Sequence, residues 1–167
     1  MNVTARTEDS PTYVNRPAPQ TDEEIILKAL QILNRRVCTQ TLMTSPDDVK
    51  NYLILRAATL EDPHRETFGV MYLDSQHRLI TVQDEFVGTL AQTSVYPREI
   101  VRAALRHNAA AVVLTHNHPS GNPQPSQADE TLTKTLKSAL ALVDVRVLDH
   151  IITAGGSAVS LAEQGLV

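Results

Sequence analysis

Apolar residues recur at helical spacing in four segments of the chain, and each segment opens on a helix-start signal. Thr21 lies three residues before Glu24, the spacing of a capping box, and Ser45 lies before Pro46, a residue that suits the first helical position. The four predicted helices begin near Thr21, Ser45, Pro97 and Ser126. In the third of them, the residues expected to face the core are Ile100, Val101, Ala104 and Leu105.

Short apolar runs predict the strands. Residues 68–73 and 79–82 flank a polar turn, so they predict a hairpin. Continuous apolar runs at residues 110–115 and 145–152 predict two further buried strands, and a short strand follows the glycine turn near the end of the chain. This alternation of strands and helices is typical of an α/β protein with a mixed sheet covered by helices on both faces.

The pattern divides the chain into three parts. Residues 1–20 are polar and contain three prolines, which predicts a disordered arm. Residues 21–44 predict an N-terminal helical extension, and residues 45–167 hold every predicted strand. With 167 residues, the chain is long enough for one domain that folds without a disulfide or a structural metal.

Composition narrows the classes of function. The formal net charge of −4 argues weakly against a surface built mainly to hold nucleic acid, although it leaves room for a local basic patch. The single cysteine, Cys38, cannot form an internal disulfide, which suits a reducing compartment. No apolar run approaches the ~18 residues that a membrane span needs. We therefore expect a cytoplasmic protein with no membrane partner.

Two histidines and an aspartate form the strongest chemical pattern. His116 and His118 follow a predicted buried strand, and side chains two apart on a strand point to the same face, so both imidazoles can reach one ion. Asp129 lies in the first turn of the helix that Ser126 caps, where the intervening loop can fold its carboxylate back toward the strand end. Three protein ligands leave the fourth tetrahedral position to water, as in catalytic zinc sites.

Each part of this pattern also has a purely structural interpretation. Paired histidines at a strand end are often polar surface, and Ser126 with Asp129 is an ordinary capping motif. The whole string is rare, however: H-x-H-P after a buried strand, a loop rich in glycine and proline, and S-x-x-D at a helix start. It predicts a Zn²⁺ site.

Hydrolysis at such a site also needs a residue that moves protons. The leading candidate is Glu66, immediately before the first predicted strand, although a solvated charge in the mixed run 61–66 is the alternative. Glu85 is the competing carboxylate, but with Asp84 it is interpreted as part of a solvated turn. His150 is either a residue that supports a metal ligand or a satisfied core histidine, and the core role is favoured.

These residues together resemble the JAMM signature of JAB/MPN metalloproteases: an upstream glutamate, H-x-H-P, six residues, and S-x-x-D. The chain is still more similar to the bacterial RadC-like branch of that family. The likeness covers about residues 45–167, and its most specific strings are residues 72–74, 95–99, 103–110, 116–121, 148–152 and 162–166.

The resemblance implies a JAB/MPN fold, related in architecture to cytidine deaminases, over residues 45–167. By residue, it implies that the zinc ligands are His116, His118 and Asp129. It also implies that Glu66 is the general acid/base and that Ser126 donates to the oxyanion. Full-length RadC proteins carry a helix-hairpin-helix region ahead of this domain. Residues 21–44 hold one evident helix and no glycine-rich hairpin, so we expect a short form that lacks this region.

Three functions follow from these patterns. The first is a zinc metallopeptidase or isopeptidase acting on a peptide or protein, with ubiquitin-like conjugates among the candidate substrates. The second is a DNA-associated accessory protein of repair, recombination or a mobile element, in which the zinc domain binds rather than cuts. The third, a metal-bearing scaffold, is disfavoured because a scaffold has no need of the complete set of catalytic residues. The sequence carries no signal for an oligomeric state.

Overall fold

A computed structural model describes residues 21–38, 45–60, 62–88 and 95–167. The disordered arm predicted for residues 1–20 lies outside this part of the chain, as does the end of the predicted extension at residues 39–44. The described helices are α1 (Asp22–Cys38), α2 (Pro46–Ala57), α3 (Pro97–Arg106) and α4 (Gln127–Ala141). The described strands are β1 (Thr67–Leu73), β2 (Leu79–Val87), β3 (Ala111–Asn117), β4 (Arg146–Ala154) and β5 (Ser157–Ser160).

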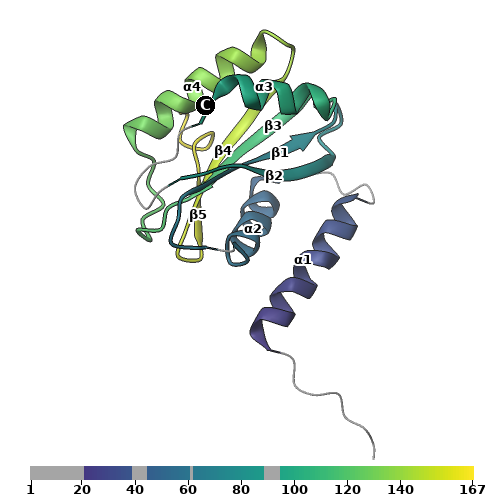
Figure 1. Ribbon diagram of the computed structural model, residues 1–167, viewed down its shortest axis with the longest axis vertical. Coiled ribbons are helices and arrows are strands. Elements are labelled where there is room, and N and C mark those ends of the chain that lie inside the picture. Colours follow the sequence, from purple (N-terminus) through teal and green to yellow (C-terminus); the bar gives the residue numbers. More distant parts are fainter. Residues whose placement is uncertain (1–20, 39–44, 61, 89–94) are drawn as a thin grey trace, which may run out of the picture.

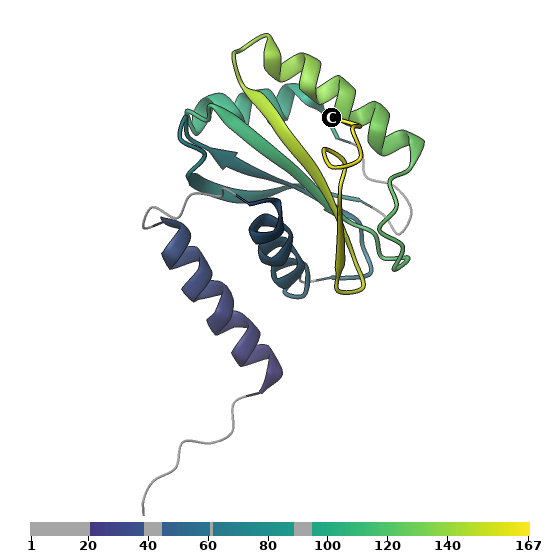
Figure 2. The same cartoon turned by 180° about the vertical axis from the view of Figure 1, so that it is seen from behind.

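The strands form one mixed sheet in the order β2-β1-β3-β4-β5. Neighbouring strands are antiparallel except β3 and β4, which run parallel because α4 carries the chain back across the sheet between them. Helices α3 and α4 cover one face, and α2 covers the other (Figures 1 and 2). The predicted α/β class, with helices on both faces of a mixed sheet, is confirmed.

Alternation along the central strands divides the core in two. On β1, Phe68, Val70 and Tyr72 pack beneath α3 and α4, whereas Met71 and Leu73 pack against α2. β3 alternates in the same way, so its even-numbered residues face α3 and α4 and its odd-numbered residues face α2. This phase decides on which face each residue at the end of β3 projects.

Two expectations from the hydrophobic pattern are wrong. β2 does not end at residue 82 but continues to Val87, which pairs with Thr67, because β1 offers a hydrogen-bonding partner over its whole length. Asp84 and Glu85 therefore belong to a strand and not to a turn. Leu105 is 53% exposed, because the buried stripe of α3 follows Ile100 and two alanines, Ala103 and Ala104.

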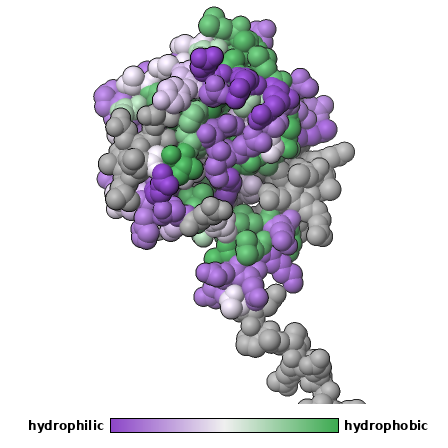
Figure 3. Space-filling model, in the orientation of Figure 1, coloured by the Kyte–Doolittle hydropathy of each residue, from purple (hydrophilic) through white to green (hydrophobic). Residues whose placement is uncertain are grey.

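Helix α1 lies beside α2 and diverges from the sheet (Figures 1 and 2). Its Leu30 is buried, whereas Ile25, Leu27 and Ile32 are exposed. Hydrophobic surface is visible on this helix in Figure 3. Within the described ranges, no helix combines the length and the apolar composition that crossing a bilayer requires.

Candidate metal centre

The two histidines of the candidate metal site lie at the end of β3. His116 shares the phase of Leu114, so its ring projects to the α4 face, and its side chain is 1% exposed. The strand ends at Asn117, yet the backbone N–H of His118 still donates to the carbonyl of Thr153 on β4 at 2.8 Å. This bond keeps the chain extended for one more residue, so the imidazole of His118 also reaches the α4 side.

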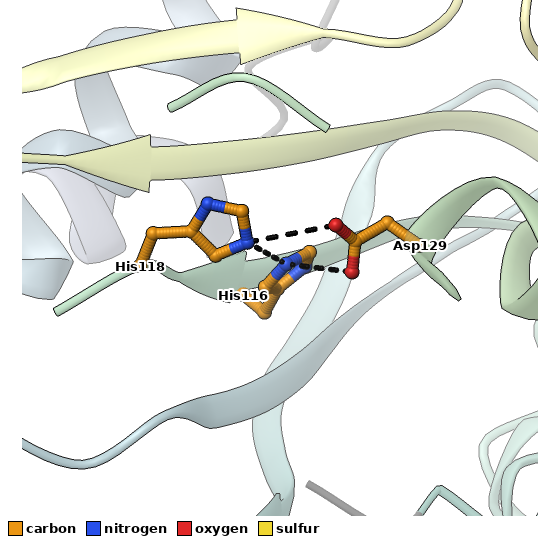
Figure 4. Close-up of side chains that lie close together, drawn as sticks. All are labelled: His116, His118 and Asp129. Atoms are coloured by element: carbon orange, nitrogen blue, oxygen red, sulfur yellow. Dashed lines mark hydrogen bonds and ion pairs between the residues drawn. The ribbon is translucent and has the colours of Figure 1, made fainter. Parts of the chain in front are cut away.

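The three predicted ligands converge (Figure 4). The Nε2 atoms of His116 and His118 are 2.8 Å apart, and the carboxylate of Asp129 lies 3.2 Å from the first and 3.6 Å from the second. Two atoms that bind one zinc ion tetrahedrally at ~2.0–2.1 Å lie about 3.4 Å from each other. The observed separations bracket that value, so the imidazole and carboxylate donors fit a single small divalent ion.

A capping box fixes the carboxylate of Asp129. Ser126 is the N-cap of α4: its hydroxyl oxygen accepts from the backbone N–H of Asp129 at 3.2 Å. The carboxylate of Asp129 in turn accepts from the backbone N–H of Ser126 at 2.7 Å and from its hydroxyl at 2.6 Å. The capping interpretation of S-x-x-D is therefore confirmed, and the same cap orients the carboxylate of the candidate ligand toward the two imidazoles.

Electrostatics keep Asp129 ionised. Burial raises the pKa of its carboxyl group, but the contacts with the imidazoles of His116 and His118 and the hydrogen bond from Ser126 outweigh burial and hold the pKa well below its usual range. The same contact acts on the partner: the hydrogen bond with Asp129 raises the pKa of His118 against the opposing effect of burial. A charged carboxylate beside two imidazoles is the donor set that a divalent cation requires.

The second nitrogen of each histidine is also engaged. Nδ1 of His118 donates to the carbonyl of Asn122 in the loop that precedes α4, at 2.8 Å. Nδ1 of His116 lies 2.9 Å from Nε2 of His150 on β4. Metal-binding histidines characteristically make such a bond with the nitrogen that faces away from the ion, since it orients the ring.

Glu66 lies at the same end of the sheet. The antiparallel register pairs Phe68 of β1 with His116, and continuing it by two residues brings Glu66 opposite His118. Glu66 is half-buried, and its negative charge contributes to the raised pKa of His118.

Asn117 holds the backbone on both sides of Glu66. Its side chain projects from the opposite face of β3 to the two histidines, and it is 8% exposed. Its amide oxygen accepts from the N–H of Thr67 at 2.7 Å, and its amide nitrogen donates to the carbonyl of Arg65 at 3.0 Å. The residue between the two ligands thus ties the strand end to the segment that carries the candidate base.

Glu85, the competing carboxylate, has a different partner. It accepts a hydrogen bond from the hydroxyl of Tyr72 at 2.6 Å. Burial of that hydroxyl and its bond to Glu85 raise the pKa of Tyr72, so the donor stays protonated. Glu85 is therefore engaged on β2 in fixing a core tyrosine.

Residues 43–166 match the family described as RadC-like JAB domain. The chain belongs to this family. It is 58% identical over 146 residues to a UPF0758 protein of Acidovorax sp. (strain JS42), an alignment that covers 84% of this chain and 60% of the relative. It is 56% identical over 146 residues to the UPF0758 protein of Albidiferax ferrireducens, covering 84% and 61% of the two chains. The chain thus spans about 60% of the length of these curated relatives.

As a RadC-like JAB domain, the protein carries the predicted H-x-H-P and S-x-x-D residues together at one end of its sheet. Sequence reasoning missed three supporting groups: the side chain of Asn117, the carbonyl of Asn122, and the hydroxyl of Thr133 on α4, which lies 2.6 Å from Nδ1 of His150. Thr133 had a signal, because it follows Asp129 by four residues and so shares its helix face. The role of Asn117 could be inferred only once it was known from which face of β3 its side chain projects.

Proposed function

We propose that this protein is a zinc-dependent hydrolase of amide bonds, a metallopeptidase or isopeptidase, that acts in the cytoplasm on a peptide or protein. The observation that carries the proposal is the convergence of three ligand atoms, from His116, His118 and Asp129, within 4.8 Å of one another. Neutral imidazole nitrogens and one carboxylate are ligands that suit zinc. Three ligands, rather than four, are typical of catalytic sites.

Zinc held there would supply a Lewis acid that polarises the scissile carbonyl and activates water. The residues of the chain would supply the proton transfers. Glu66, at the level of His118 in the strand register, would take a proton from water on its carboxylate and deliver it to the leaving amine. Imidazoles that bind the ion through their lone pairs would not be free to accept this proton.

Ser126 is proposed as the donor to the oxyanion. In the structure its hydroxyl hydrogen is directed to the carboxylate of Asp129 at 2.6 Å, so donation to substrate requires the hydroxyl to rotate away from that oxygen. Its place at the N-terminus of α4 adds the positive end of the helix dipole, which stabilises negative charge developing beside it.

The first test is metal analysis of the purified protein, followed by a screen of peptides and ubiquitin-like conjugates with the wild type and Glu66→Gln. We expect zinc in both proteins and a loss of turnover of about 10²–10⁴-fold in the variant, the usual contribution of a general acid/base. Glu85→Gln is the matched control, because it alters a carboxylate that is bonded to Tyr72 instead, and it should retain activity. Turnover that is unchanged in Glu66→Gln would overturn the assignment of the base.

A DNA-associated role is the alternative function. Helix α3 exposes Arg98 and Arg102, whose side chains are 87% and 74% accessible, although both lie within ion-pair distance of Glu99. Phosphate binding would give an affinity that falls linearly with salt on logarithmic axes. Salt-dependent DNA binding that survives removal of zinc, in a protein that cleaves no amide, would favour this alternative over hydrolysis.

A further inference from the structure

A histidine with no route to solvent lies directly behind the metal centre. His150, on β4, is fully buried, and its Nε2 is 2.9 Å from Nδ1 of His116. Its other nitrogen, Nδ1, is 2.6 Å from the hydroxyl of Thr133 on α4. That hydroxyl donates to the backbone carbonyl of Asp129 at 2.6 Å. A continuous chain of hydrogen bonds therefore begins at one ligand and ends on the backbone of another.

The backbone carbonyl of Asp129, which ends this series of hydrogen bonds, fixes the direction of every bond in the series. A carbonyl oxygen can only accept, so the single hydroxyl hydrogen of Thr133 is committed to Asp129. At Nδ1 of His150, the hydrogen must then belong to the ring, and Thr133 accepts it. His150 is 0% exposed, and its ring nitrogens lie against an imidazole and a hydroxyl rather than a carboxylate, so a charge on this ring would be buried without a counter-ion; the ring is therefore neutral and its Nε2 is an acceptor.

The last step reaches the metal ligand. Because Nε2 of His150 accepts, the hydrogen between the two rings belongs to Nδ1 of His116. A neutral imidazole with its hydrogen on Nδ1 has a lone pair on Nε2, and Nε2 is the atom that faces His118 and Asp129. The series of hydrogen bonds thus selects the tautomer of His116 that can bind an ion.

We infer that Thr133 and His150 are positioning residues that hold His116 in its metal-binding tautomer, with the backbone of Asp129 as the fixed end of the relay. This inference rests on the metal site of the proposed function. It assigns a role to a core threonine that makes no side-chain contact with any of the three ligand side chains in the bonds described above. It also converts His150 from a satisfied core residue into a determinant of metal affinity.

Removal of the Thr133 hydroxyl should reverse the direction of the hydrogen bond between His150 and His116. In Thr133→Val, Nδ1–H of His150 has no acceptor, whereas the other tautomer of His150 can still donate from Nε2 to Nδ1 of His116. That arrangement moves the hydrogen of His116 to Nε2, where it blocks the ion. We therefore expect zinc affinity to fall about 10–100-fold, as is usual when the support of a metal-binding histidine is lost.

The experiment compares three variants with the wild type. Thr133→Ser keeps the hydroxyl and should keep the zinc affinity. Thr135→Val is the matched control, because Thr135 makes the same type of hydroxyl bond to a carbonyl four residues back, to Thr131 at 2.8 Å, on the exposed side of the same helix. Zinc dissociation constants come from competition with a chromophoric chelator. The tautomer of His116 comes from long-range ¹H–¹⁵N spectra of the imidazoles in metal-free protein.

The expected result is a loss of affinity confined to Thr133→Val, with the hydrogen of His116 moved from Nδ1 to Nε2. If Thr133→Val binds zinc as tightly as Thr135→Val does, and its His116 is still protonated on Nδ1, the inference is overturned. If the valine variant fails to fold, His150→Phe takes its place, because it keeps a ring against Phe68 and removes both nitrogens, and the same loss of affinity is expected. A wild type that binds no zinc would defeat the proposed function, while the spectra would still decide the tautomer.

Discussion

His118 is the candidate ligand at which protons would compete most directly with a metal ion. Its Nε2 faces Asp129, whose hydrogen bond raises the pKa of this imidazole above the ordinary value of 6.5. Asp129 itself stays ionised, because its pKa is held well below the usual range. A metal binds only the neutral imidazole, so affinity is full above the pKa of His118 and falls as the pH falls through it.

We therefore expect zinc affinity to weaken about tenfold per pH unit, for each imidazole proton displaced, once the pH is below the pKa of His118. Chelator competition at a series of pH values measures this slope. His77→Gln is the control, because His77 lies in the turn between β1 and β2, where it contacts Arg146 and none of the candidate ligands, and the profile should not change. An affinity that is indifferent to pH across the histidine range would contradict ligation by His118.

At the scale of elements, the site depends on how the end of β3 is joined to the segment before β1. Asn117 makes that joint with two bonds from one buried side chain, to Thr67 and to Arg65, on either side of Glu66. The carbonyl of Glu66 also accepts from the backbone N–H of Gly88 at 2.8 Å, so β2 holds the same segment from the other side. The segment of the candidate base is thus held by the ends of β2 and β3, the two strands that neighbour β1.

We expect Asn117→Ala to lower turnover about 10²-fold with zinc content unchanged, because a displacement of about 1 Å in a catalytic group costs that much. Asn117→Asp keeps the acceptor for Thr67 and should lose less. Thr153→Val is a control for burial in the same layer, since it removes only a 3.4 Å bond to the carbonyl of His116. Steady-state kinetics and metal analysis of the three variants would test whether Asn117 holds Glu66 in place. Full activity in Asn117→Ala would show that β2 suffices to hold Glu66.

At the scale of the whole molecule, a metal ion at the candidate site would join parts that the core already holds together. Two apolar clusters, one on each face of the sheet, bury the central strands without contribution from the three ligands. The protein should therefore remain folded when zinc is stripped by a chelator. Zinc binds the folded state, so it should add about 4 kcal/mol to the free energy of unfolding at a concentration 1,000 times its dissociation constant.

Thermal denaturation with and without chelator tests this expectation, and the midpoint should rise with zinc in the wild type. In Asp129→Asn the midpoint should not respond to zinc, whereas Glu130→Gln, one residue along the same helix turn, should respond as the wild type does. Unfolding of the wild type upon chelation would mean that the ion is a structural requirement of this domain.

The hydrophobic pattern predicted most elements because burial on this sheet is strictly two-sided. Runs of apolar residues in β1 and β3 can only be central strands, and the helix starts carry their own capping residues, as at Ser45 and Ser126. The hydrophobic pattern gave wrong predictions where contacts with neighbouring residues decide the length of a strand or the exposure of a side chain. β2 extends to Val87 because β1 pairs with it, and Leu105 is exposed because two small alanines fill the contact beneath α3.

The sequence by itself identified the three candidate ligands and the start of the helix that carries Asp129, because these depend on local spacing and on a cap formed within four residues. Only the tertiary structure decided what surrounds them. His150 and Thr133 reach the site from β4 and α4, and Asn117 reaches the segment of Glu66 from the far face of β3. Such contacts depend on strand order and phase, which bring together residues up to about fifty positions apart, and no local pattern encodes that distance.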